Sequence, residues 1–220
     1  MPQPVSTVAE RPPASKWLVL VLVCFAQFMV ILDATITNVA LPSIQQDLHF
    51  SDSQLQWVVN AYSLLFGGFL LLGGRAADLF GRKRLFLAGV VLFTIASLAS
   101  GLSQGSTSLI VARGLQGLGA ALVSPAALSI ITTTFAEGVE RTRALGVWAA
   151  IAAGGGAFGL LLGGFLTDAL SWQWIFFVNV PIGLAAFLLS LRFVRSRASQ
   201  PRRAASTCRA PCSRPVAWCC

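Results

Sequence analysis

Apolar residues fall into six long runs separated by short polar segments. The runs cover residues 17–40, 55–74, 85–102, 109–135, 144–166 and 174–194. Each is close to the roughly 20 residues that an α-helix needs to cross the hydrocarbon core of a bilayer. The pattern predicts an all-α membrane protein in which residues 17–194 form a bundle of six transmembrane helices, between an N-terminal tail (1–16) and a C-terminal tail (195–220).

The composition supports membrane helices over a soluble fold. Hydrophobic residues make up 55% of the 220 positions and charged residues only 11%, against roughly 25% charged in soluble domains. The first run could be read as a secretory signal peptide. It is longer than the apolar part of such a peptide, it carries Asp33 and Asn38, and five more runs follow it, so we interpret it as a retained helix.

The net charge of +8 could suggest nucleic-acid binding. Lys and Arg nevertheless occur mainly in alternate connections, which is how membrane proteins set their orientation, so we expect a lipid bilayer as partner and no nucleic acid. Placing the N-terminus in the cytoplasm puts these basic residues inside: Arg11, Lys16, Arg75, Arg82, Lys83, Arg84, Arg141, Arg143, Arg192, Arg195 and Arg197. The opposite connections contain no Lys or Arg and carry only Asp47, His49, Asp52 and Asp168.

Two charged residues lie well inside the predicted spans. Asp33 is sixteen residues beyond Trp17, which places it about 24 Å into a hydrocarbon layer roughly 30 Å thick. Arg113 is four residues past Leu109, about 6 Å from the opposite boundary. The two opposite charges are therefore at the same depth, and they can pair if the first and fourth helices pack together.

Two interpretations of this pair remain open. A carboxylate beside a cation at a hydrated cavity can exchange a proton for a cationic ligand, and intramembrane charges are functional by default. Alternatively, the pair only fixes two helices together. Other polar residues in these helices and in the second could line a cavity or bond between helices: Gln27, Thr37, Asn38, Asn60 and Gln116.

Small residues mark one face of the fifth predicted helix. Gly155, Gly159 and Gly163 recur at intervals of four, forming a groove into which another helix can fit, and Gly146 and Gly164 add to it. Packing is the simpler interpretation, and a sealing or hinge contact at the cavity is the functional one. We expect the partner for this groove to be missing from the chain.

Several motifs together resemble the major facilitator superfamily, specifically its fourteen-helix drug:proton antiporter branch of the EmrB/QacA type. The second connection matches the cytoplasmic signature of the family, with Leu79 in place of its first arginine, through Gly74, Asp78, Gly81, Arg82, Lys83 and Arg84. Residues 32–42 resemble the first-helix motif of the drug-exporting branch. Arg113, Gln116, Gly117 and Gly119 resemble the fourth-helix motif.

The fifth-helix glycines fit the antiporter motif, although Leu160 stands at its usual proline, and residues 172–183 resemble the sixth-helix motif. The resemblance implies a transporter of the bacterial inner membrane, not an enzyme, in which two six-helix bundles rock about a cavity and this chain supplies the first. It implies proton coupling at Asp33 and Arg113, with Asn38 and Gln116 nearby, and a gate at the cytoplasmic signature.

The resemblance also implies the partners. They are small amphipathic or cationic drug-like substrates and a C-terminal bundle that this chain lacks, so we expect the chain to be inactive alone. A proton gradient would drive export without a cofactor. The alternative is a non-transporting membrane protein that binds or regulates a full-length transporter through its glycine-rich face.

The tail after residue 195 has no helical period. It carries Cys208, Cys212, Cys219 and Cys220, but no histidine or paired spacing supports a metal site, and we expect none. Read one base out of frame from Ala205, the codons permit a sequence resembling the seventh-helix start of the same branch. Our hypothesis is a frameshifted or truncated gene product.

Overall fold

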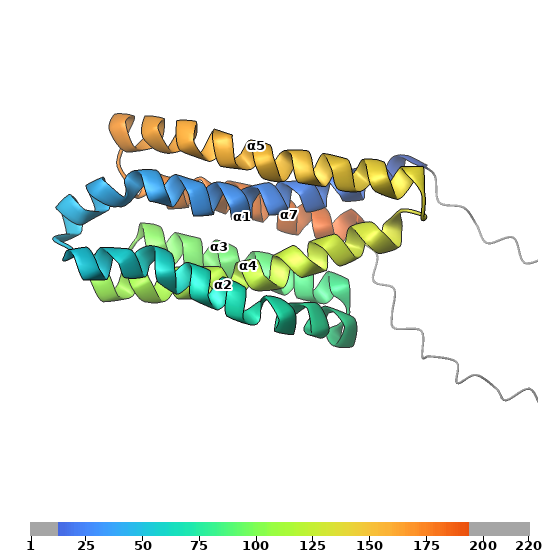
Figure 1. The fold of residues 1–220 in the computed structure, drawn as a ribbon, viewed down its shortest axis with the longest axis horizontal. Coiled ribbons are helices and arrows are strands. Elements are labelled where there is room, and N and C mark those ends of the chain that lie inside the picture. Colours follow the sequence, from blue (N-terminus) through green and yellow to red (C-terminus); the bar gives the residue numbers. More distant parts are fainter. Residues whose placement is uncertain (1–12, 194–220) are drawn as a thin grey trace, which may run out of the picture.

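A computed structural model describes residues 13–193, which form helices and no strands (Figure 1). The expectations for residues 1–12 and for the tail 195–220 lie outside the described residues. The helices are α1 Pro13–Leu48, α2 Asp52–Phe80, α3 Arg82–Gly101, α4 Ser106–Thr134, α5 Val139–Ala169, α6 Trp174–Phe177 and α7 Asn179–Phe193.

The six predicted spans are confirmed, with α6 and α7 together forming the sixth. Most helices extend beyond the predicted runs, because hydropathy marks only the apolar part of a helix whereas backbone hydrogen bonding continues into polar sequence. The largest difference is in α1, which continues through Pro42 to Leu48. The predicted connection over residues 41–54 is thereby reduced to three residues, 49–51.

The predicted sixth helix is confirmed as one span, Trp174–Leu191, but its regular hydrogen bonding is interrupted at Val178, between α6 and α7. Val178 itself keeps helical dihedral angles, φ −62° and ψ −27°. Pro181 lies four residues after Phe177, so it cannot donate the backbone hydrogen bond that the Phe177 carbonyl would receive in a regular helix. The interruption places Asn179 at the first position of α7.

Close packing between helices organises the bundle. α5 lies along α1 in Figure 1, and α4 lies with α2 and α3. A methyl group at Gly117 of α4 would collide with the backbone carbonyl of Tyr62 in α2, and one at Gly119 would come within 2.7 Å of the backbone nitrogen of Phe93 in α3. Glycine at these two positions lets α4 approach both neighbours.

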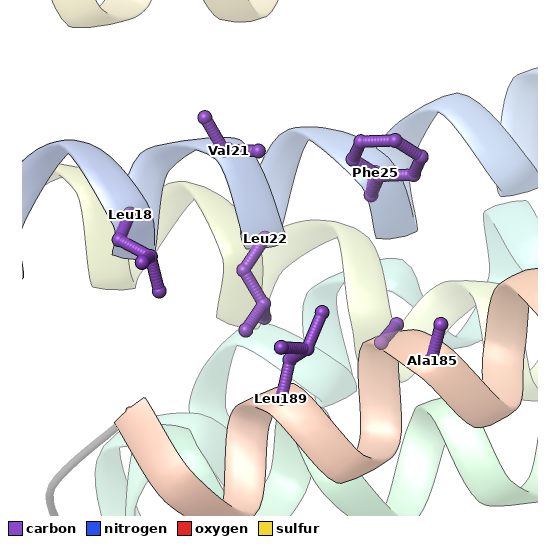
Figure 2. Close-up of a pocket in the computed structure, with 7 residues that line it drawn as sticks. Leu18, Val21, Leu22, Phe25, Ala185 and Leu189 are labelled. Atoms are coloured by element: carbon purple, nitrogen blue, oxygen red, sulfur yellow. The ribbon is translucent and has the colours of Figure 1, made fainter.

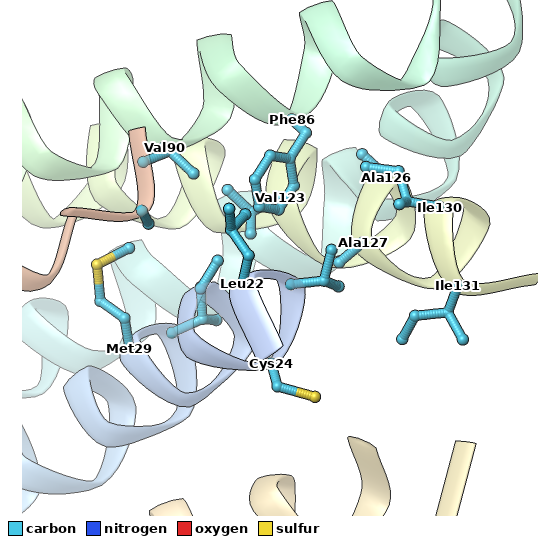
Figure 3. Close-up of a cluster of buried hydrophobic side chains, with 14 of the residues drawn as sticks. Leu22, Cys24, Met29, Phe86, Val90, Val123, Ala126, Ala127, Ile130 and Ile131 are labelled. Atoms are coloured by element: carbon cyan, nitrogen blue, oxygen red, sulfur yellow. The ribbon is translucent and has the colours of Figure 1, made fainter. Parts of the chain in front are cut away.

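Two apolar clusters fill the bundle. The larger joins α1, α3 and α4, whose side chains Met29, Phe86, Val90, Val123 and Ala127 appear in Figure 3. The second lies further along α1 and includes Leu32, Ile36, Leu109, Ile175 and Phe176.

The glycine face of α5 does have a partner within the chain, contrary to our expectation. A methyl group at Gly155 would lie 3.2 Å from Phe28, and one at Gly163 would lie 3.0 Å from Ile36, both in α1. Gly159 likewise faces Thr35. Since α1 fills the groove, this face is not available to a second protein. Gly146 and Gly164 have no neighbour within 4 Å and are not part of the groove.

Candidate functional site

A buried polar cluster lies where the two apolar clusters meet. On α1, Met29 and Val30 belong to the first cluster and Leu32 and Ile36 to the second, with Asp33 at the junction. The same order recurs on α4, where Arg113 and Gln116 lie between Leu109 and Ala120. Polar residues are thus placed at one level of several helices and enclosed by apolar side chains on either side.

Asp33 is at the centre of this cluster. Its side chain is 0% exposed and that of Arg113 1%. Arg113 Nη1 donates to Asp33 Oδ2 at 2.6 Å, Gln116 Nε2 donates to Oδ1 at 2.7 Å, and Asn179 Nδ2 donates to the same Oδ1 at 2.9 Å. All these partners are donors, so the arrangement is complementary to an ionised carboxylate.

Arg113 has further partners besides Asp33. Its Nη1 also donates to Gln116 Oε1 at 3.0 Å, and its Nε donates to the backbone carbonyl of Val58 in α2 at 3.4 Å. The guanidinium carbon lies 4.4 Å from the centre of the Tyr62 ring and 5.8 Å from that of Phe176, within the range of a cation–π interaction. The cation would therefore keep several contacts if Asp33 lost its charge.

The cluster extends to α3 and to the interrupted span. Ser97 Oγ of α3 donates to the backbone carbonyl of Phe176 in α6 at 2.9 Å and accepts from Asn179 Nδ2 at 3.2 Å. Hydrogen bonds therefore connect α1, α3, α4, α6 and α7 through one set of side chains.

The structure brings together Asp33, Arg113 and Gln116, as the depth argument predicted for the two charges. It does not bring Asn38 to them. The Asn38 side chain is exposed, and its Nδ2 donates to the carbonyl of Ala34 in its own helix at 3.1 Å. Five residues correspond to about 140° around a helix, so Asn38 and Asp33 lie on different faces.

Sequence reasoning gave no role to Asn179, Tyr62 or Ser97. Asn179 carried a usable signal, since it is the sole amide side chain in the sixth apolar run. Tyr62 and Ser97 carried little, because a hydroxyl inside a span is common and its direction depends on how the helices are rotated against one another.

The predicted gate residues lie at the turn between α2 and α3. Asp78 Oδ1 is 3.7 Å from Arg82 Nη2, and both side chains are largely solvent-accessible, at 64% and 39%. Gly81 adopts φ 93°, a conformation that favours glycine. Lys83 Nζ donates to the backbone carbonyl of Leu191 in α7 at 3.4 Å. Arg84 is exposed, and Gly74 lies in α2 beside Pro125.

An apolar groove of about 290 Å³ lies elsewhere, between α1 and α7 (Figure 2). Its lining residues include Leu18, Leu22 and Phe25 of α1 and Leu189 of α7. Asp33 lies eight residues beyond Phe25, about 12 Å along the helix. The groove carries no polar side chain to orient a ligand, and we do not assign it to the site.

Comparison with known proteins identifies the family. The sequence profile of the Major Facilitator Superfamily matches residues 23–218. The chain belongs to the major facilitator superfamily. Members of this superfamily are transporters, not enzymes, and the six spans make this chain an integral membrane protein.

Relatives of this major facilitator chain carry names connected with drug efflux or resistance. It is 50% identical over 183 residues to the puromycin resistance protein pur8 of Streptomyces alboniger, covering 83% of this chain and 36% of that protein. It is 50% identical over 182 residues to the cephamycin export protein CmcT of Amycolatopsis lactamdurans, covering 83% of this chain and 37% of the relative. The chain thus spans little more than a third of the length of these relatives.

Solved structures share the fold of this chain. A crystal structure of the peptide transporter POT superposes with a TM-score of 0.71 at 18% identity, over 79% of this chain and 37% of that one. A bacterial homologue of the human lysosomal transporter Spinster, in an inward-facing conformation, superposes with a TM-score of 0.67 at 22% identity, over 84% of this chain and 43% of that one. At these identities the likeness concerns the fold alone.

Proposed function

We propose that this chain is the N-terminal bundle of a proton-coupled drug exporter of the fourteen-helix antiporter branch, in which Asp33 exchanges a proton in step with drug binding. The observation that carries the proposal is the enclosed Asp33–Arg113 pair, at 2.6 Å and almost without exposure. Ionisable residues inside a membrane protein are rare and mark ion pathways or proton relays. The names of the relatives support drug-like substrates.

The contacts of the pair suggest how two states can exist. With Asp33 ionised, its carboxylate accepts from Arg113, Gln116 and Asn179. A proton on Asp33 removes the charge that holds Arg113 at Oδ2. Arg113 then retains the Gln116 oxygen, the Val58 carbonyl and the Tyr62 ring. Loss of the proton restores the pair, and a cationic substrate would compete with Arg113 for the same carboxylate.

The proposal includes orientation and partners. The N-terminus lies in the cytoplasm of a bacterial cell with the bundle in its inner membrane, and small amphipathic or cationic molecules are the substrates. A second bundle completes the cavity, because alternating access requires one bundle to rock against another. The Asp78–Arg82 pair and its basic neighbours lie at the cytoplasmic end and act as a gate element. The proton gradient supplies the energy.

The proton step can be tested on the 220-residue chain in lipid nanodiscs by infrared difference spectroscopy between neutral and acid pH. We expect a carboxylic C=O band from protonated Asp33 that is absent in Asp33→Asn. The matched control is Asp52→Asn, which removes an exposed carboxylate at the start of α2 and should keep the band. The same difference spectrum for the unmodified chain and for Asp33→Asn would contradict the proposal.

A further inference from the structure

Among the described residues, Asn179 is the hydrogen-bond partner of the Asp33 carboxylate that comes from the sixth span. Gln116 and Arg113 both belong to α4, a continuous helix. Asn179 is the first residue of α7, directly after the interruption at Val178. Any change in the strength of its bond to Asp33 therefore acts where the regular hydrogen bonding of the helix is already interrupted.

In the described residues, the Asn179 side chain forms hydrogen bonds only through its nitrogen. Nδ2 donates to Asp33 Oδ1 at 2.9 Å and to Ser97 Oγ at 3.2 Å. Its Oδ1 is buried and has no hydrogen-bond partner among the residues that the structure describes. The attachment of this amide to α1 thus depends on a single acceptor, and the strength of that bond depends on whether the acceptor is charged.

The other side of the interruption is connected to the same amide. Ser97 accepts from Asn179 and donates to the backbone carbonyl of Phe176, in the single turn of α6. Ser97 is thus hydrogen-bonded to residues on both sides of Val178, to Phe176 before it and to Asn179 after it. Asp33 is the only charged member of this chain of bonds.

We propose that Asn179 is a positioning residue through which the protonation state of Asp33 reaches the interruption between α6 and α7. A hydrogen bond from an amide N–H to a carboxylate is about twice as strong as one to a neutral oxygen. With Asp33 ionised, Asn179 holds the start of α7 against α1. With Asp33 protonated, this bond weakens and the segment around Val178 opens more often. Among the described residues, the charged group paired with Asp33 is Arg113 of α4, and the titratable Tyr62 of α2 lies against the Arg113 guanidinium.

This inference rests on the proposed proton step at Asp33, and hydrogen exchange can test it. Backbone amide hydrogen exchange is measured at one pH on the 220-residue chain in nanodiscs. The exchange ratio is the rate for a peptide spanning residues 172–183 divided by the rate for a reference peptide from α2. We expect exchange in the first peptide to be about fivefold faster in Asp33→Asn and in Asn179→Leu. The double variant should be no faster than the faster single, because Asp33→Asn weakens and Asn179→Leu removes the same bond.

Asn38→Leu is the matched control, since it removes an amide that does not contact Asp33, and exchange should be unchanged. Because Asp33→Asn leaves Arg113 buried without its counter-charge and can impair folding, the unmodified chain is also compared at neutral and acid pH, relative to the α2 peptide. The exchange rate of the 172–183 peptide relative to the α2 peptide should rise on acidification in the unmodified chain and should not rise in Asn179→Leu.

The outcomes separate the two proposals. An acid-induced Asp33 carboxyl band with an unchanged exchange ratio would overturn the role of Asn179 alone. Multiplying effects of Asp33→Asn and Asn179→Leu would also overturn it, since they would then act through different bonds. Absence of the Asp33 band would overturn the proposed proton step and this inference with it.

Discussion

Asp33 and Arg113 illustrate how an isolated charge becomes tolerable inside a membrane bundle. Each has an exposed fraction of 1% or less, so neither is hydrated by bulk water. Asp33 accepts three hydrogen bonds, and Arg113 adds an aromatic face and a backbone carbonyl to its ion pair. Removing one partner leaves the other buried without compensation, which is more destabilising than removing both.

This asymmetry gives a prediction for stability. Arg113→Leu should lower the free energy of unfolding of the detergent-solubilised chain by about 3–5 kcal/mol, because Asp33 remains as an unpaired buried charge. Adding Asp33→Asn should recover part of that loss. The measurement is denaturant-induced unfolding followed by circular dichroism. Losses that simply add in the double variant would show that the two side chains do not stabilise one another.

The sequence predicted the pair but not its surroundings, for a geometric reason. Depth along a helix follows from residue number, so Asp33 and Arg113 could be placed at one level. Helix spacing already separated Thr37, four residues from Asp33 and on its face, from Asn38, five residues away and on another face, so the assignment of Asn38 to the site was avoidable. Asn179 was missed although it is the sole amide side chain in the sixth apolar run, because the sequence does not show which helix faces it.

At the scale of elements, the pairing of α1 with α5 depends on the absence of side chains at three positions. Gly155, Gly159 and Gly163 face α1 directly, which brings the two backbones close enough for many small dispersion contacts. The interval of four predicted this face correctly. The partner was mistaken, because the sequence shows that a groove exists and not which helix fills it.

Substitutions along α5 can distinguish groove positions from open ones. Gly159→Ala should destabilise the chain by about 1–3 kcal/mol, because the new methyl group meets the side chain of Thr35 and lies 3.2 Å from the carbonyl of Leu32. Gly146→Ala is the matched control, with nothing within 4 Å, and it should cause no loss. Thermal unfolding in detergent measures both. Equal effects at the two positions would contradict close packing at Gly159.

Element boundaries were the least predictable part of the fold. Apolar runs located all six spans, yet α1 extends eight residues past its run, from residue 40 to Leu48. Pro42 did not end the helix, and Pro181 coincided with an interruption. At the second site the Ser97 hydroxyl donates to the backbone carbonyl of Phe176, a tertiary contact that the sequence does not show.

The whole molecule has charges of opposite sign at its two ends. Among the described residues, basic side chains gather where α2 meets α3 and where α4 meets α5. The other end carries Asp47 near the end of α1, Asp52 at the start of α2 and Asp168 near the end of α5, without Lys or Arg. By the positive-inside rule, this distribution predicts that the basic end faces the cytoplasm. The two solved structures share the fold but do not establish the direction of insertion.

Cysteine accessibility tests this orientation. In a background without the five native cysteines, Gln104→Cys between α3 and α4 should react with a membrane-impermeant maleimide added to intact cells. Ala136→Cys between α4 and α5 should react only after the membrane is opened. Both positions are exposed and lie at opposite ends of the bundle. The reverse pattern of labelling would show that the N-terminus is outside.

Coupled transport is the central claim, and it can be measured in liposomes. Because one bundle cannot alternate access, residues 17–194 replace the matching part of the puromycin resistance protein of Streptomyces alboniger, and the 220-residue chain serves as reference. We predict that a puromycin gradient drives proton movement in the opposite direction through the chimaera and not through the reference. Asp33→Asn should abolish this movement while Asp52→Asn preserves it. Undiminished puromycin-driven proton movement in Asp33→Asn would contradict the account.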